Sequence, residues 1–120
     1  MYLLIWETGA AIMEKLIERG LLFDYYGGLL SEKNKRIYEA AVDDMSLSEI
    51  ADESGISRQA VSEALRRTDD KLKRYEKELG LIERAGKLEA EIKALKDAVG
   101  EDIIDRQKLK AIIDRMENTI

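Results

Sequence analysis

The residues best suited to specific chemistry lie at the start of one helical segment. Arg58 and Gln59 open this segment, and Ser62 and Arg66 follow at the spacing of a helical face. An arginine can donate two hydrogen bonds to the edge of guanine, and a glutamine can pair with adenine in the same way. These residue types at this spacing predict a helix that reads base edges in the major groove of DNA.

Two further kinds of contact are predicted around this helix. Ser48 and Ser57 fall at helix starts, where hydroxyl and backbone N–H groups can hold a phosphate. Arg66 and Arg67 are placed to reach the sugar-phosphate backbone. The candidate DNA-binding residues are therefore Ser48, Ser57, Arg58, Gln59, Ser62, Arg66 and Arg67.

The same residues also fit an ordinary exposed helix. Arginine, glutamine and serine are common on solvated helical faces, and Ser57 is needed as a helix cap whatever the protein does. Glu63 would repel phosphate unless it accepts a hydrogen bond from a cytosine amino group. Lys71, Lys73 and Arg74 are typical of a solvated face. The residue types therefore favour DNA binding without requiring it.

The composition argues against enzymatic function. The chain of 120 residues has no histidine and no cysteine, and its formal net charge is −5. Because it lacks the usual general base, thiolate nucleophile and soft metal ligands, we expect neither an enzyme nor a bound metal or cofactor. The acidity lies outside the candidate helix, since three arginines and one glutamate give residues 57–68 a charge of +2.

A helix-turn-helix over residues 46–67 is predicted to hold the candidate residues in place. Ser46 and Glu49 have the spacing of a capping box, in which each side chain accepts a hydrogen bond from the other residue's backbone N–H. Gly55 suits the left-handed conformation that stops a helix, and Ala51 is small enough for two helices to cross steeply. The apolar contacts around the turn are expected from Ile50, Ile56, Val61 and Leu65.

The remaining sequence indicates an all-α protein in three segments. It is 45% hydrophobic and 38% charged and has no proline. Residues 1–12 are expected to form a poorly ordered extension, or else a helical turn packed on the core, before a natural start at Met13. Residues 13–79 form the helix-turn-helix domain, and residues 80–120 form a helical hairpin or coiled-coil-like extension. The apolar amino end is too short to span a membrane and lacks a basic flank, so we expect a cytoplasmic protein.

Apolar spacing predicts the buried faces of the helices. The first stripe is interrupted by Gly20 and again by Gly27 and Gly28, and a second helix begins after Ser31 and ends at Asp43. A long helix breaks at Gly80, and a heptad-like seam then runs to Gly100. The predicted inward residues are Leu16, Ile17, Leu21, Leu22, Phe23, Tyr26, Leu29, Leu30, Ile37, Tyr38, Ala41, Val42, Leu65, Leu72, Tyr75, Leu79, Ile82, Leu81, Ala85, Leu88, Ile92, Leu95, Val99, Ile104, Leu109, Ile112, Ile113 and Met116.

Several stretches of the chain resemble the YlxM-like proteins, helix-turn-helix proteins of Gram-positive bacteria. The resemblance covers residues 13–88, with weaker similarity to the end, and is carried by "LFDYYGGLLSEKN", "SLSEIAD", "GISRQAV" and "RRTDDKLKRYEKELGL". It implies a fold like region 4 of sigma factors. It also implies a link to the signal recognition particle pathway, because the family's genes commonly lie beside those of the particle protein and its receptor. The family motif carries over at Ser57, Arg58, Gln59, Ala60 and Val61.

Two hypotheses of different kinds follow. In the first, the protein is a DNA-binding regulator that dimerises through its apolar seam. In the second, the helix-turn-helix is a scaffold, and the acidic surface binds the protein or RNA of the signal recognition particle. A basic face around Arg58, Arg66, Arg67 and Lys71 favours the first, whereas burial of Arg58 and Gln59 would argue against base reading. The sequence leaves open whether residues 81–120 pair with a second copy or cover the recognition helix.

Overall fold

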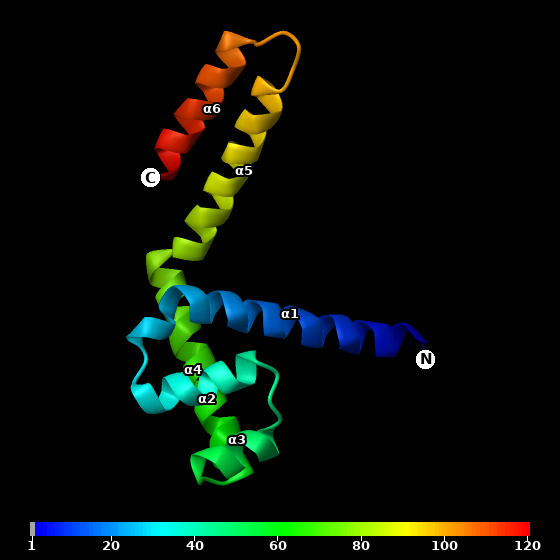
Figure 1. Cartoon of the computed structure of the whole chain (residues 1–120), viewed down its shortest axis with the longest axis vertical. Coiled ribbons are helices and arrows are strands. Elements are labelled where there is room, and N and C mark those ends of the chain that lie inside the picture. The colour runs from blue at the N-terminus through cyan, green and yellow to red at the C-terminus, as the bar shows by residue number, and fades with distance from the viewer. Residues whose placement is uncertain (1) are drawn as a thin grey trace. The chain divides into compact units, whose positions relative to one another are not determined.

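The computed structural model describes residues 2–120 of the chain, with side chains from residue 13 onward (Figure 1). Within these residues the chain forms six α-helices and one short 3-10 helix, and no strand. The predicted all-α fold is therefore confirmed. The elements are α1 (Tyr2–Tyr26), η1 (Gly27–Leu29), α2 (Glu32–Val42), α3 (Leu47–Ser54), α4 (Arg58–Leu79), α5 (Leu81–Val99) and α6 (Arg106–Thr119).

The first helix differs from the predicted pattern in two respects. Its backbone is helical from Tyr2, where the sequence predicts a poorly ordered extension or a helical turn packed on the core. The side chains of residues 1–12 lie outside the described residues, so whether this segment packs on the core stays a prediction. Gly20 lies inside α1 without interrupting it, so that part of the prediction is wrong. Gly27 does end the helix. A Cβ atom there would meet the ring of Phe23 at 2.8 Å, so the close approach of ring and backbone favours glycine.

The described residues divide into two units between Leu79 and Gly80. Gly80 has a φ of 63°, in the left-handed region that glycine adopts without a steric penalty. It separates the end of α4 from the start of α5, so the predicted break at this glycine is confirmed.

In the amino-terminal unit, α4 is the central helix. Helices α1, α2 and α3 each pack against α4, and α2 also packs against α1 and α3 (Figure 1). Fully burying a large apolar side chain contributes about 1.5–3 kcal/mol, so these contacts supply most of the unit's stability. The buried apolar residues are Leu22, Tyr26, Leu30, Ile37, Tyr38, Ala41, Ile50, Ala51, Val61, Leu65 and Leu72.

The apolar stripe of the first helix is narrower than predicted. Leu22, Tyr26 and Leu30 are buried at a spacing of four residues. By contrast, Ile17 and Leu29 are 60% and 57% exposed, and Leu21 is also exposed. Because a helix packed on one side covers only part of its circumference, residues on the edges of the stripe stay in solvent.

The second helix begins and ends at local signals. Ser31 caps it by accepting a hydrogen bond from the backbone N–H of Asn34 at 3.3 Å. After Val42 the chain turns at Asp44, whose φ is 64°, and the N–H of Met45 donates to the carbonyl oxygen of Ala40 at 3.0 Å. Both predicted boundaries of α2 are confirmed.

The carboxyl-terminal unit is an antiparallel pair formed by α5 and α6 (Figure 1). Arg115 Nε donates to Glu91 Oε2 at 2.9 Å and so links the two helices. Near the connection, Lys108 Nζ lies 2.9 Å from Glu101 Oε1, and this hydrogen bond raises the pKa of the lysine. The helix before the connection ends at Gly100, as predicted.

Only part of the predicted seam is buried in this pair. Ala98 and Ile112 are buried, and Ala85, Leu88 and Leu95 are half-buried as predicted. Val99 is 52% exposed, so the prediction is one residue too far along only at the end of α5. Ile104 precedes the start of α6, and both Ile104 and Ile113 are exposed. Two helices can cover only one face of each other, which leaves the outer apolar residues in solvent. The exposed ones include Leu81, Ile92, Val99, Ile103, Ile104 and Ile113.

Candidate nucleic-acid interface

The turn between α3 and α4 is built by short-range hydrogen bonds. The N–H of Glu49 donates to Ser46 Oγ at 3.1 Å, and the Glu49 carboxylate accepts from the N–H of Ser46 at 3.5 Å. At the other end of α3, Gly55 has a φ of 68°, and its N–H donates to the carbonyl of Ala51 at 2.9 Å. The predicted capping box and glycine stop are therefore both confirmed.

The start of α4 is fixed by Ser57. Its hydroxyl oxygen accepts a hydrogen bond from the N–H of Ala60 at 3.0 Å, and its carbonyl accepts from the N–H of Val61 at 3.0 Å. The Ser57 hydroxyl is therefore already used as a cap. A phosphate at this position would have to contact the remaining free N–H groups of the first turn.

The crossing of α3 and α4 is close and apolar. Ile50 is 1% exposed and Val61 is fully buried, while Ala51 and Leu65 are also buried. Ala51 lets the two helices approach because its side chain is a single methyl group. Since Val61 and Leu65 fix one side of α4 against the core, the opposite side of its first three turns must face solvent.

The candidate DNA-binding residues are all exposed. They lie in α3, at the turn and along the first three turns of α4: Ser48, Ser57, Arg58, Gln59, Ser62, Arg66 and Arg67. Glu63 is exposed among them. Arg66 Nη1 lies 3.7 Å from Asp70 Oδ2 on the same helix, an exposed pair that solvent screens strongly.

A buried ionic cluster, which the sequence did not reveal, anchors α4 in the unit. Arg19 from α1 donates from Nε and Nη2 to the two carboxylate oxygens of Asp69 at 3.0 and 2.8 Å. Tyr38 from α2 donates its hydroxyl to Asp69 Oδ1 at 2.7 Å. Asp69 therefore joins three helices, and the Arg19 guanidinium also stands 5.9 Å from the centroid of the Tyr38 ring.

The environment of this cluster shifts the pKa values of its members. Burial alone would raise the pKa of Asp69, but hydrogen bonds from Arg19 and Tyr38 outweigh it and lower that pKa. The pKa of Tyr38 is raised mainly by burial and then by the hydrogen bond that its hydroxyl donates to the Asp69 carboxylate. The stable arrangement is therefore an ionised Asp69 beside a charged arginine and a neutral tyrosine.

A second contact ties α1 to the far end of α4. The hydroxyl of Tyr26 donates to Glu76 Oε1, and the Tyr26 ring lies 6.1 Å from the ring of Tyr75. Together with the Asp69 cluster, this contact holds α4 in its fourth to sixth turns. The first turns, which carry Arg58 and Gln59, extend from that anchored part as one continuous helix.

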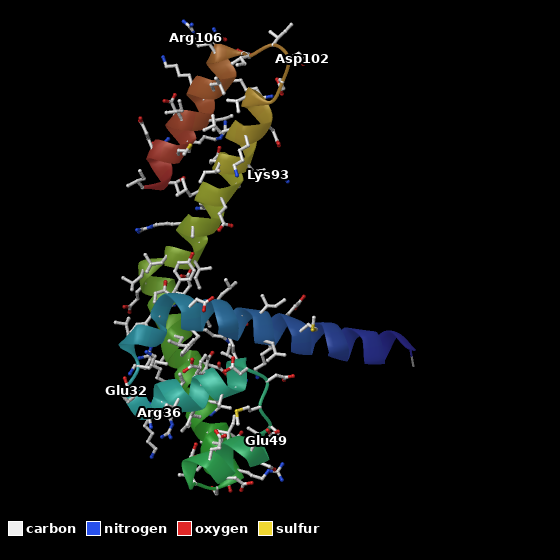
Figure 2. All side chains as sticks on the ribbon, in the orientation of Figure 1. Glu32, Arg36, Glu49, Lys93, Asp102 and Arg106 are labelled. Carbon is white, nitrogen blue, oxygen red and sulfur yellow. The ribbon has the colours of Figure 1, made fainter. Side chains whose placement is uncertain are left out.

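The hollow between α2 and α3 carries mixed charge. It has a volume of about 670 Å³, with Ile37, Ala40 and Ile50 forming its apolar part. Its polar residues are Glu32, Lys33, Arg36, Glu53 and Ser54, and Figure 2 shows Glu32 and Arg36 projecting from the same end of α2. Because two carboxylates and two cations line it, this hollow has no charge preference for phosphate.

Two other kinds of site are absent from the described residues. No group of three or more carboxylate, histidine or cysteine side chains is placed to hold a metal ion there. Nor is any helix in the described part of the chain both long and apolar enough to cross a membrane.

Comparison with known proteins agrees with this geometry. The chain matches the family described as "UPF0122: Putative helix-turn-helix protein, YlxM / p13 like" over residues 13–114. It is 36%, 34% and 32% identical over 107 residues to UPF0122 proteins of Shouchella clausii, Halalkalibacterium halodurans and Bacillus cereus. Each alignment covers 88% of this chain and 97% of the relative. The resemblance noted in the sequence is therefore confirmed, and the chain belongs to the YlxM / p13 like family of helix-turn-helix proteins.

Proposed function

We propose that the protein is a sequence-specific DNA-binding regulator in which the first three turns of α4 read base edges in the major groove. The observation that carries this proposal is that Arg58, Gln59 and Ser62 are exposed on the turns of α4 where Val61 and Leu65 pack into the core. A helix packed in this way presents its polar face to a groove without disturbing the core. Each bidentate contact of the arginine–guanine or glutamine–adenine type contributes about 1–3 kcal/mol of discrimination between bases.

Phosphate contacts would position this helix. Ser48 lies in the first turn of α3 and Ser57 caps the start of α4, and Arg66 and Arg67 lie two to three turns further along α4. If about five to seven phosphates are neutralised, the logarithm of the binding constant should fall against the logarithm of salt with a slope of roughly −4 to −6.

A mobility-shift assay with genomic fragments tests the proposal. The fragments should include the DNA upstream of the protein's own operon, and binding should be measured at low salt. Arg58→Ala and Gln59→Ala should lower affinity at particular base pairs by about 1–3 kcal/mol each. Arg84→Ala is the matched control, because Arg84 is an exposed arginine of α5. If the folded wild-type protein binds no fragment at low salt, the proposal is wrong.

The regulator is proposed to act as a homodimer. The exposed apolar residues of α5 and α6, among them Ile92 and Ile113, support this, because pairing with a second copy would remove them from water. Light scattering after size exclusion should give twice the chain mass. Ile92→Glu and Ile113→Glu should give monomers that remain helical, since both side chains are exposed in the single chain. A monomeric wild-type protein would rule out this part of the proposal.

The same proposal includes the similarity of the fold to region 4 of sigma factors and a cytoplasmic location. The packing of α1, α2 and α3 around α4 supports a fold like region 4 of sigma factors, in which helices wrap a helix-turn-helix. A DNA-binding role also implies a cytoplasmic location, where the chromosome of a bacterium lies.

The alternative function is an interaction module of the signal recognition particle pathway. The formal net charge of −5 favours it, because an acidic surface suits a basic protein partner better than a nucleic acid. A pull-down from lysate that monitors the particle's GTPase and RNA tests this alternative. Stimulation of the GTPase, or protection of the RNA, would support it, and the absence of both would count against it.

A further inference from the structure

A small hollow lies between the first turn of α2 and the middle of α4. It has a volume of about 300 Å³ and is lined by Asn34, Ala64, Arg67, Thr68 and Lys71. Ala64 supplies only a methyl group, which leaves room between the longer side chains. No carboxylate of the described residues lines this hollow, whereas the α2–α3 hollow includes two of them.

The two cations of the hollow are not neutralised within the unit. Neighbouring cations of α4 are paired: Arg66 lies 3.7 Å from Asp70, and Lys73 lies 3.7 Å from Glu18. Over the described part of the chain, Arg67 and Lys71 form no ion pair. Their guanidinium and ammonium groups are hydrogen-bond donors only, and the Asn34 amide adds two more N–H donors. This set of groups suits an anion with several acceptor oxygens.

The hollow lies beside the base-reading face of α4. At 3.6 residues per turn, Ser62, Arg66 and Glu63 lie between about −60° and +40° of Gln59 around the helix axis. On the same scale Arg67 lies at about +80° and Lys71 at about +120°. A helix that fills a major groove about 12 Å wide touches base edges with one face and the two phosphate backbones with its sides. Arg67 and Lys71 therefore lie on the side that faces one backbone.

We propose that this hollow, formed by Asn34, Arg67 and Lys71, binds a phosphate of the DNA strand along one wall of the groove that α4 enters. The proposal rests on the proposed DNA-binding function and extends it, because Asn34 is not among the candidate residues found from the sequence, where Lys71 counts only as part of a wider basic face. The contact fixes the rotation of α4 in the groove. It carries no base preference, because every backbone phosphate is alike.

Lys71→Gln tests the cation of the site. The probes are a duplex selected from genomic fragments and a duplex of random sequence with the same length. The variant should weaken binding to both probes by about three- to tenfold at moderate salt, and reduce the magnitude of the salt slope by about one. The ratio of the two affinities should stay unchanged. Arg58→Ala, by contrast, should lower that ratio. Lys71→Arg, which keeps the charge, should bind both probes like the wild type.

Asn34→Asp tests the hollow without a loss of stability. The substitution nearly preserves shape, and a carboxylate in the first turn of α2 interacts favourably with the helix dipole, so the melting temperature should not fall. Affinity for both probes should nevertheless fall by about tenfold or more, because the carboxylate repels phosphate. Lys33→Gln is the matched control. It neutralises a lysine adjacent to Asn34 that lines the other hollow, and its effect should be smaller.

Three outcomes would overturn the proposal in distinguishable ways. If Arg58→Ala lowers the affinity ratio but Lys71→Gln and Asn34→Asp behave like Lys33→Gln, the hollow binds no phosphate and the proposed function stands. If the wild type binds neither probe, the proposed function fails and this site fails with it. If the variants weaken binding to a structured RNA but not to either duplex, the assignment to DNA is wrong.

Discussion

Replacing Asp69 should weaken the amino-terminal unit strongly without altering the proposed DNA-contacting surface. Asp69→Asn keeps the size of the side chain and removes its charge. The Arg19 guanidinium then lies half-buried beside a neutral amide, and one of the three hydrogen bonds that Asp69 accepts is lost or reversed. A cation without its partner carries a desolvation cost that the carboxylate had offset.

The magnitude follows from the burial of the pair. The side chains of Arg19 and Asp69 are 17% and 12% exposed. Removing one partner of a fully buried pair costs about 3–5 kcal/mol, and partial access of water to Arg19 lowers that figure. We expect a loss of about 2–4 kcal/mol in the free energy of unfolding. For a unit of this size that corresponds to a fall of roughly 10–25 °C in melting temperature.

Thermal and urea unfolding followed by circular dichroism measures this loss, and the adjacent residue supplies the control. Asp70 carries the same side chain on the same helix, but it is 61% exposed, and its pairing with Arg66 spans 3.7 Å. Asp70→Asn should therefore change the free energy of unfolding by less than about 0.5 kcal/mol. The contrast between the two variants isolates burial and pairing from the chemistry of the substitution.

A double-mutant cycle decides whether the pair itself is responsible. Arg19→Met should also be destabilising, because it leaves Asp69 charged and buried without its cationic partner. The double variant Arg19→Met, Asp69→Asn should cost less than the sum of the single losses by at least about 1 kcal/mol, since it leaves no unpaired charge. Additive losses, or an Asp69→Asn loss no larger than that of Asp70→Asn, would refute the reasoning.

The remaining predictions concern pH and the turn. As pH falls below about 4, the unfolding free energies of wild type and Asp69→Asn should converge. The pKa of Asp69 is lower in the folded chain than its value of about 3.9 in the unfolded chain, so its stabilisation is complete above that value and is lost when Asp69 is protonated. Tyr38→Phe should lower the free energy of unfolding by about 1–2 kcal/mol near neutrality. Above pH ~10 the variant should lose less stability than wild type, because the raised pKa of Tyr38 stabilises the folded chain only while the tyrosine of the unfolded chain keeps its proton. Both are measured by urea titration across pH. Ser46→Ala and Gly55→Ala should each cost about 1 kcal/mol in thermal unfolding, the first through a lost cap and the second through its φ of 68°.

The turn and the helix boundaries could be predicted because their causes are local. The capping box joins Ser46 to a residue three positions away, and Ser57 caps the N–H of Ala60 at the same spacing. The positive φ of Gly55 and Gly80 depends on the residue itself. Both partners of such a contact lie within a few residues of each other, so the local sequence is enough to predict it.

The anchoring cluster could not be predicted because its parts are remote in sequence. Asp69 meets Arg19 across 50 positions and Tyr38 across 31. In the sequence Asp69 reads as one of many acidic residues on an exposed helix, and nothing local marks it as buried. The hollow that contains Asn34 and Lys71 is likewise created by the packing of α2 on α4.

The sequence predicts only part of the buried face between α5 and α6, because apolar spacing leaves a choice between neighbouring residues. The spacing of four and three residues fits a seam ending at Val99, yet Ala98 is the buried residue. An alanine lets α5 and α6 approach closely, and the larger valine is then left on the edge. Where two neighbouring apolar residues both fit a heptad, the partner helix decides which one is buried.

The acidity of the whole chain says little about the field at the proposed interface. Charges in solution are screened over about 8–10 Å at moderate salt, so a net charge of −5 spread over the chain acts weakly at the first turns of α4. Within α4, the charge of Asp69 is compensated by Arg19, and Asp70 is paired with Arg66. Arg58, Arg67 and Lys71 have no such partner in the described residues. The potential that a phosphate meets is therefore set by a few nearby cations, and this is why DNA binding by this acidic chain should be steeply dependent on salt.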